Sequence, residues 1–170
     1  VKKDGELCWE FDRLFQEIKN GLKKCKEIGK IPVSMGVDTW GVDFVLMDKD
    51  DKVLGNTVGY RDHRNEGMDE EVYKTISLED LYARTGIQKA IFNTVYQLMA
   101  VKTKHPEYLE QAETMLHVPD YFHYLLTGKK TCEYTEATTG QLVNAETKDW
   151  DYELIDKLGY PRKMFQKLIM

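Results

Sequence analysis

Two carboxylates flank a glycine in a polar turn near the start of the chain. Asp38 and Asp43 lie on either side of Gly41, and Trp40 precedes the glycine. Carboxylates accept hydrogen bonds from hydroxyl groups, a glycine lets a ligand approach the backbone closely, and an indole offers a flat apolar face. This combination suits a polyhydroxylated ligand. Each aspartate has an alternative role in capping backbone N–H groups, and Trp40 can equally point into the core.

Phe92 and Asn93 form a second candidate segment, directly before a helical pattern. An apolar ring and an amide side by side suit a deoxy sugar, which carries a methyl group and several hydroxyls. The alternative is that Phe92 packs in the core and Asn93 only caps the helix. The candidate substrate-binding residues are therefore Gly41, Trp40, Asp43, Phe92 and Asn93.

Charged residues elsewhere are less specific. Arg61 and Arg64 could bind a phosphate, but a surface ion pair with Asp62 or Glu66 is the more common role for such residues. Asp62 itself reads as a turn residue. Asp120 stands at a predicted helix start and is expected to act as a cap or a structural acceptor.

Several familiar sites are absent from the sequence. It contains neither Gly-x-x-x-x-Gly-Lys-Ser/Thr nor Gly-x-Gly-x-x-Gly, so no cofactor-binding residue is predicted. His117 and His123 have no neighbouring ligand pattern, so no metal site is predicted. Cys8, Cys25 and Cys132 are an odd set without Cys-x-x-Cys spacing, which predicts reduced thiols in a cytoplasmic protein.

Composition bounds the remaining possibilities. The chain has 170 residues with 42% hydrophobic residues, 31% charged residues and a net charge of -5. A chain near this length buries roughly 70% of its unfolded surface, so one domain with a real core is expected. The negative charge argues against nucleic acid as a partner, and no apolar run approaches the roughly 20 residues of a membrane span. The charged start gives no sign of a signal peptide, and the absence of a first methionine suggests that a segment precedes Val1.

Helical and strand patterns alternate along the chain, which predicts an α/β fold. Apolar residues at three- and four-residue steps predict a helix from Phe11 to Ile28. The predicted strands are 33–37, 44–47, 53–54 and 114–118. The other predicted helices are 68–76, 78–84 with a Ser77 cap, 93 or 94 to 104, 119–128, 134–142 and 152–158, with a loop at 144–151.

Three words of the sequence, in this order along the chain, resemble the FGGY carbohydrate kinases. They are Gly36 to Asp43, Phe92 to Thr94 and Pro119 to Phe122, within an agreement that covers essentially the whole chain. The general family signature has Lys where this chain has Gln97 and Trp where it has Ala100. This departure favours the rhamnulokinase branch, whose form is Phe-Asn-Thr-x-Tyr-Gln-Leu.

The resemblance implies an actin-like, ribonuclease-H-like α/β fold, incomplete in this chain, in which Gly41 contacts a ketose. It implies that the parent protein phosphorylates the 1-hydroxyl of L-rhamnulose with ATP and Mg²⁺. The alternatives are another ketose kinase, of the xylulokinase or fuculokinase type, and a non-catalytic sugar-binding module of the same fold.

Against that family pattern, residues 1–170 are expected to be part of an N-terminal sugar-binding domain. The first phosphate-binding strand, the catalytic aspartate in a His-Asp-Thr-like word and the ATP-binding domain are expected to lie outside them. No catalytic residue is therefore expected here, and residues 1–170 alone should be inert and bind no cofactor. An uncovered sheet edge next to residues 33–37 should make this piece self-associate.

Overall fold

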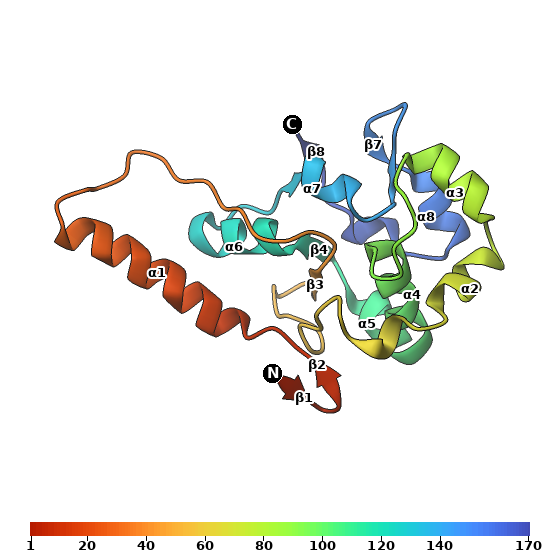
Figure 1. Ribbon diagram of the computed structural model, residues 1–170, viewed down its shortest axis with the longest axis horizontal. Coiled ribbons are helices and arrows are strands. Elements are labelled where there is room, and N and C mark those ends of the chain that lie inside the picture. The colour runs from red at the N-terminus through yellow and green to blue at the C-terminus, as the bar shows by residue number, and fades with distance from the viewer.

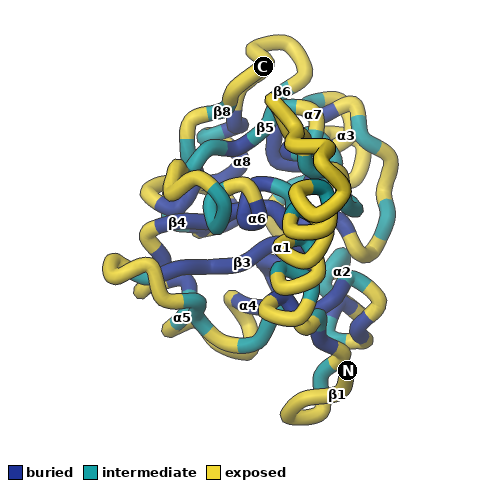
Figure 2. Tube along the Cα trace, turned by 90° about the vertical axis from the view of Figure 1, so that its left-hand side faces the viewer, coloured by how far each residue is buried: buried dark blue, intermediate teal, exposed yellow.

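Two buried strands lie at the centre of the fold. In the computed structural model, which describes residues 1–170, β3 (Phe44–Met47) pairs antiparallel with β4 (Thr114–His117). Phe44 lies opposite His117, and Met47 lies opposite Thr114. Every residue of both strands is buried, which Figure 2 shows as a continuous dark segment. A strand pair covered on both faces carries apolar side chains at consecutive positions, as Phe44 to Met47 does.

Helices cover this pair. α4 (Thr94–Lys104) is buried along its first eight residues, from Thr94 to Val101, α5 (Pro106–Gln111) contacts β3, and α6 (Val118–Thr127) follows β4 directly. The remaining helices are α2 (Met68–Tyr73), α3 (Leu78–Thr85), α7 (Tyr134–Thr138) and α8 (Tyr152–Lys157), with short 3-10 turns at His63–Asn65 and Arg162–Met164. The remaining strands form short pairs, β1 (Lys2–Lys3) with β2 (Glu6–Leu7), β5 (Cys132–Glu133) with β8 (Leu168–Ile169), and β6 (Val143–Asn144) with β7 (Asp149–Trp150). The predicted α/β class is confirmed.

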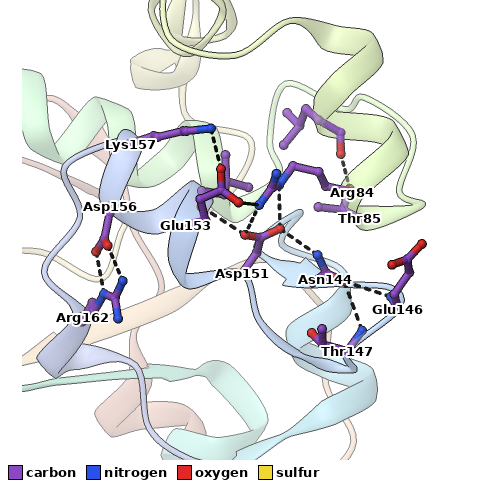
Figure 3. Close-up of polar contacts among 12 residues, drawn as sticks. Arg84, Thr85, Asn144, Glu146, Thr147, Asp151, Glu153, Asp156, Lys157 and Arg162 are labelled. Atoms are coloured by element: carbon purple, nitrogen blue, oxygen red, sulfur yellow. Dashed lines mark hydrogen bonds and ion pairs between the residues drawn. The ribbon is translucent and has the colours of Figure 1, made fainter.

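A buried ion pair joins α3 to the C-terminal part of the chain. The Nε and Nη2 atoms of Arg84 each donate to a carboxylate oxygen of Asp151 at 2.8 Å (Figure 3). Asp151 also accepts from the backbone N–H of Leu154 at 3.1 Å, which caps α8, and from Asn144 Nδ2 at 3.1 Å in β6. One carboxylate thus joins three elements.

The first long helix forms as predicted. α1 (Phe11–Glu27) extends away from the rest of the chain, and residues 28–43 return beside it as a long connection (Figure 1). Phe11 is its one buried residue, and most of the helix is exposed in Figure 2. Its apolar face is therefore only partly covered.

The predicted strand at 33–37 is wrong. These residues form no strand, Val33 is fully exposed and Met35 is 48% exposed. A strand requires a neighbour that accepts and donates its backbone hydrogen bonds, and no other segment of residues 1–170 pairs with this one.

Smaller differences concern the second half. The helix predicted at 134–142 ends at Thr138, and the loop predicted at 144–151 contains the β6–β7 hairpin. The predicted helix break at His105 and Pro106 is followed at once by α5, because proline is well accommodated in a first helical turn. Ser77 caps α3 as predicted, accepting from the Asp80 N–H at 3.0 Å. None of the helices combines the length and apolarity needed to cross a bilayer.

Candidate functional site

The carboxylate of Asp43 organises the region that the sequence singled out. Its Oδ2 accepts from Trp9 Nε1 at 2.7 Å, Trp40 Nε1 at 3.0 Å and the Tyr60 N–H at 3.1 Å, and its Oδ1 accepts from Gln97 Nε2 at 2.9 Å. Burial raises the pKa of this carboxyl above its ordinary value, and the four hydrogen bonds oppose that shift only in part. Asp43 has no exposed surface. It therefore orders the side chains that line the site.

Aromatic rings line the solvent side of this carboxylate. Trp9 and Trp40 lie with ring centroids 4.2 Å apart at 37°, and both indole N–H groups are turned inward to Asp43. Tyr60 meets Phe92 edge-on at 5.5 Å, and Phe92 remains 39% exposed. We call these four rings the aromatic shelf. It offers flat apolar area of the kind that contacts sugar rings and methyl groups.

The backbone beside the shelf is strained. Val42 has φ +68°, and the Asp43 N–H donates to the Gly41 carbonyl at 2.9 Å, which closes a three-residue γ-turn of the rare positive-φ kind. A β-branched residue in this region costs on the order of 1–3 kcal/mol and persists only where the surroundings fix it. Such strain concentrates at functional sites, which marks residues 41–43 as the centre of the candidate site.

Side chains from two other elements hold the turn. The Val42 N–H donates to Thr139 Oγ1 at 3.2 Å, and the Val42 carbonyl accepts from Thr94 Oγ1 at 2.8 Å and from Gln97 Nε2 at 3.2 Å. Thr94 and Gln97 lie in the first turn of α4, and Thr139 follows α7. Both polar backbone groups of the strained residue are thus satisfied by side chains distant in sequence.

Gly41 packs against Thr139. A Cβ atom at residue 41 would lie 3.1 Å from Oγ1, 3.2 Å from Cγ2 and 3.3 Å from Cβ of Thr139. The sequence suggested glycine here so that a ligand could approach the backbone. The structure adds a packing reason, because Thr139 fills the space where a side chain would be.

The second candidate segment joins the first through Gln97. Gln97 Nε2 donates to the Phe92 carbonyl at 2.9 Å, in addition to Asp43 and Val42. Asn93 is 3% exposed, and its Nδ2 donates to the Gln88 carbonyl at 3.1 Å, so its side chain does not cap α4. The structure therefore brings all five predicted site residues into one region, with Asp43 and Asn93 beneath the surface.

An acidic cleft of about 430 Å³ lies next to the turn, lined in part by Asp38, Asp120, Glu133 and Glu136. Asp120 Oδ1 accepts from the Glu133 N–H at 3.0 Å, which confirms its predicted role as a structural acceptor. Asp120 Oδ2 and Glu136 Oε1 are buried without a partner. Burial raises the pKa of each of these two carboxyls to about 7.

The two arginines do not form the predicted surface ion pairs. Arg64 Nη2 donates to Gln97 Oε1 at 3.1 Å, and Arg61 Nε donates to the Tyr60 hydroxyl at 3.0 Å. Asp62 instead accepts from the backbone N–H groups of Leu7 and Arg64. Burial lowers the pKa of Arg64, so its contact with a neutral amide carries a desolvation cost.

Comparison with known proteins decides the family. The N-terminal domain of the FGGY family of carbohydrate kinases matches residues 2–170. The chain belongs to this family. Over 168 residues, 99% of this chain, it is 56% identical to a rhamnulokinase of Halalkalibacterium halodurans and 53% identical to one of Oceanobacillus iheyensis, and covers 36% of each. It thus spans about a third of the length of these relatives.

Solved sugar kinases share the fold of this FGGY domain. All of the chain superposes on 35% of a ligand-bound xylulose kinase from Lactobacillus acidophilus, with a TM-score of 0.82 at 21% identity. A gluconate kinase from the same organism gives a TM-score of 0.81 at 20% identity and the same coverage. At these identities the likeness shows the fold alone, and it confirms the predicted sugar-kinase N-terminal fold.

Residues 1–170 show neither a cluster of metal-binding side chains nor a phosphate-binding sequence. No group of three or more His, Cys, Asp or Glu side chains is placed to hold a metal ion. Asp120 Oδ2 and Glu136 Oε1 in the acidic cleft have no hydrogen-bond partner, and they belong to no such group. No glycine-rich phosphate turn is present.

Sequence reasoning missed three residues of the site. Trp9 and Thr139 lie far along the chain from Gly41 and carry no local chemical signal of their own, although both lie within the stretch that agrees with the family. Gln97 was visible as a departure from the general FGGY signature. Its contact with Asp43 is visible only in the structure.

Proposed function

We propose that the protein containing this FGGY domain phosphorylates the 1-hydroxyl of L-rhamnulose with magnesium ATP. The observation that supports this best is the likeness, over 99% of this chain, to proteins named rhamnulokinase. Residues 1–170 would be part of the N-terminal sugar-binding domain. ATP, Mg²⁺ and the catalytic base would then be held by other parts of the parent protein, and residues 1–170 alone would be inert.

The aromatic shelf and the γ-turn would form the sugar-binding surface. Trp40 would stack on one face of the ketose, and Phe92, which keeps 39% of its surface exposed, would contact the methyl group of the deoxy sugar. The backbone of Gly41 would meet sugar hydroxyls on the side away from Thr139. Asp43 and Asn93 would hold these groups in place from beneath.

The chemical contribution of this domain would be orientation. Phosphoryl transfer depends on positioning the acceptor hydroxyl in line with the phosphate, so a rigid sugar site raises the rate without joining the bond changes. The N–H and carbonyl groups of Val42 are already paired within the protein, which limits the ordering required when the sugar binds. The free thiols of Cys8, Cys25 and Cys132 support a cytoplasmic location.

A substrate panel tests the proposal. The full-length protein is assayed for ADP release with L-rhamnulose, L-fuculose, D-xylulose and glycerol, and sugar affinity is measured by calorimetry. We expect the highest kcat/KM for L-rhamnulose. A higher value for L-fuculose or D-xylulose would assign the protein to another ketose kinase. Sugar binding without ADP release would identify a non-catalytic binding module.

The Phe92→Ser variant tests whether Phe92 contacts the methyl group of the sugar. It should weaken the preference for L-rhamnulose over a ketose lacking the methyl group by about tenfold, because one methyl contact is worth about 1 kcal/mol or more in an apolar pocket. Leu78→Ser is a matched control, since Leu78 is similarly exposed but lies in α3 and not in the shelf. An equal loss of preference in both variants would remove Phe92 from the site.

A further inference from the structure

We propose that Gln97 is the positioning residue that keeps the γ-turn at Gly41 and the segment at Phe92 in fixed register. The proposal rests on the proposed function, because it assumes that these two segments contact the sugar. Gln97 itself is fully buried. It would act through the groups that it holds.

The side-chain amide of Gln97 donates and accepts hydrogen bonds at both of its ends. Nε2 lies 3.2 Å from the Val42 carbonyl, 2.9 Å from Asp43 Oδ1 and 2.9 Å from the Phe92 carbonyl, so three acceptors share two N–H groups. On the other side, Oε1 accepts from Arg64 Nη2 at 3.1 Å.

Gln97 is the side chain that connects the two segments. Thr94 and Thr139 also hold Val42, but neither hydroxyl bonds to the Phe92 segment. Val42 has φ +68° and needs its surroundings to stay there. Removing the amide would leave the Val42 carbonyl with Thr94 alone, take one donor from Asp43 and break the hydrogen bond to the Phe92 carbonyl, while the core of α4 stays packed.

The position requires a neutral group that donates toward the turn. A carboxylate of the same shape would place negative charge against three acceptors, including the buried Asp43 carboxylate. A thioether of similar length fills the volume but donates nothing. The two substitutions separate the hydrogen bonds of Gln97 from its packing.

The test uses the full-length protein with Gln97→Met, Gln97→Glu and the control Tyr73→Phe. Tyr73 shares a 3.0 Å hydrogen bond with Tyr96 of α4, so the control loses a hydrogen bond to the same helix without touching the turn. We expect Gln97→Met to raise the KM for L-rhamnulose about tenfold and leave the KM for ATP within twofold. The control should leave both within twofold of wild type.

A pH profile separates positioning from general loss of stability. Burial and the adjacent Asp43 should raise the pKa of the carboxyl introduced by Gln97→Glu, and Arg64, whose Nη2 lies 3.1 Å from Gln97 Oε1, should lower it. Because two effects oppose one, the carboxyl should take up a proton as pH falls from 8 to 6. The protonated acid can donate as the amide does. The sugar KM of this variant should therefore fall toward wild type over that range by at least threefold, whereas wild type shows no such recovery.

The proposal would be overturned if Gln97→Met lowered the melting temperature but left the sugar KM within twofold of wild type. A pH-independent KM for Gln97→Glu would also count against it. If the wild-type protein phosphorylates a ketose other than L-rhamnulose, the proposed substrate is wrong. The ratio of variant to wild-type KM, measured with the ketose that is phosphorylated, then decides the role of Gln97. If no sugar is phosphorylated, dissociation constants from calorimetry decide it, and the absence of any sugar binding would overturn both proposals.

Discussion

Replacing Gly41 with alanine should strain the γ-turn through one neighbour, Thr139. The added Cβ would lie 3.1–3.3 Å from three atoms of that side chain, which must yield by a few tenths of an ångström. Thr139 is not free to rotate, because its Oγ1 donates to the Glu136 carbonyl at 2.8 Å and accepts from the Val42 N–H at 3.2 Å. Each hydrogen bond contributes about 0.5–1.5 kcal/mol, and overpacking typically costs about 1–3 kcal/mol. We therefore expect Gly41→Ala to lower the free energy of unfolding by about 1–3 kcal/mol and to raise the KM for the sugar.

A double-mutant cycle with Thr139→Ala measures this contact directly. Removing Oγ1 and Cγ2 of Thr139 takes away the two closest contacts, so Gly41→Ala should cost at least about 1 kcal/mol less in that background. Thermal and urea unfolding of the full-length protein give the four values. Gly36→Ala is the control, because a Cβ there meets nothing within 4 Å. Additivity within about 0.5 kcal/mol would refute the reasoning and show that residue 41 does not press on Thr139.

Three further predictions concern other parts of the domain. Arg84→Met should destabilise the fold by about 2–3 kcal/mol, because the Asp151 side chain is only 3% exposed and would lose its charged partner. Lys157→Met breaks an exposed ion pair with Glu153 and should cost under about 0.5 kcal/mol. Melting temperatures of the two variants give the comparison. Asp120 has its folded-state pKa raised from 3.8 to about 7, so its contribution to stability is present at pH 4 and is lost as pH rises to 7. The melting temperature of Asp120→Asn minus that of wild type should therefore increase across this range, and a constant difference would contradict the shift. Residues 1–170 alone should self-associate at micromolar concentration through exposed apolar side chains, since residues 33–37 form no sheet edge. Val33→Asp should reduce the association measured by light scattering because Val33 is fully exposed, and a monomeric wild-type piece would contradict the prediction.

Local signals in the sequence predicted the helices well. α1 follows from apolar residues at helical spacing, α3 from the Ser77 cap, and α6 from a proline near its start and Gly128 at its end, where φ is +73°. These features act within one or two turns of the chain, so the sequence contains all the information needed. The strand predicted at 33–37 contains two β-branched valines, which favour a strand. A strand also needs a pairing partner, and the local sequence does not reveal whether one is present.

The site divides in the same way. Trp40 and Gly41 were found because their residue types carry chemical meaning at that spacing. The side chains that hold them were not found from the sequence, because they are distant along the chain. The Val42 N–H bonds to Thr139, 97 residues away, and the Val42 carbonyl bonds to Gln97, 55 residues away. A positive φ at Val42 has no sequence signal at all, because a β-branched residue normally excludes it. Tertiary contacts therefore decide the part of the site that is most unusual.

This strain has a consequence for how the domain would work. A flexible turn would have to be ordered each time a sugar binds, and that ordering would reduce affinity. Here the turn is ordered when the domain folds, because Thr94, Gln97 and Thr139 fix Val42 with hydrogen bonds that need no ligand. Asp43 likewise has its donors in place before any sugar arrives. A site built in this way favours orientation of the acceptor hydroxyl, and orientation is the contribution that phosphoryl transfer most requires from a sugar-binding domain.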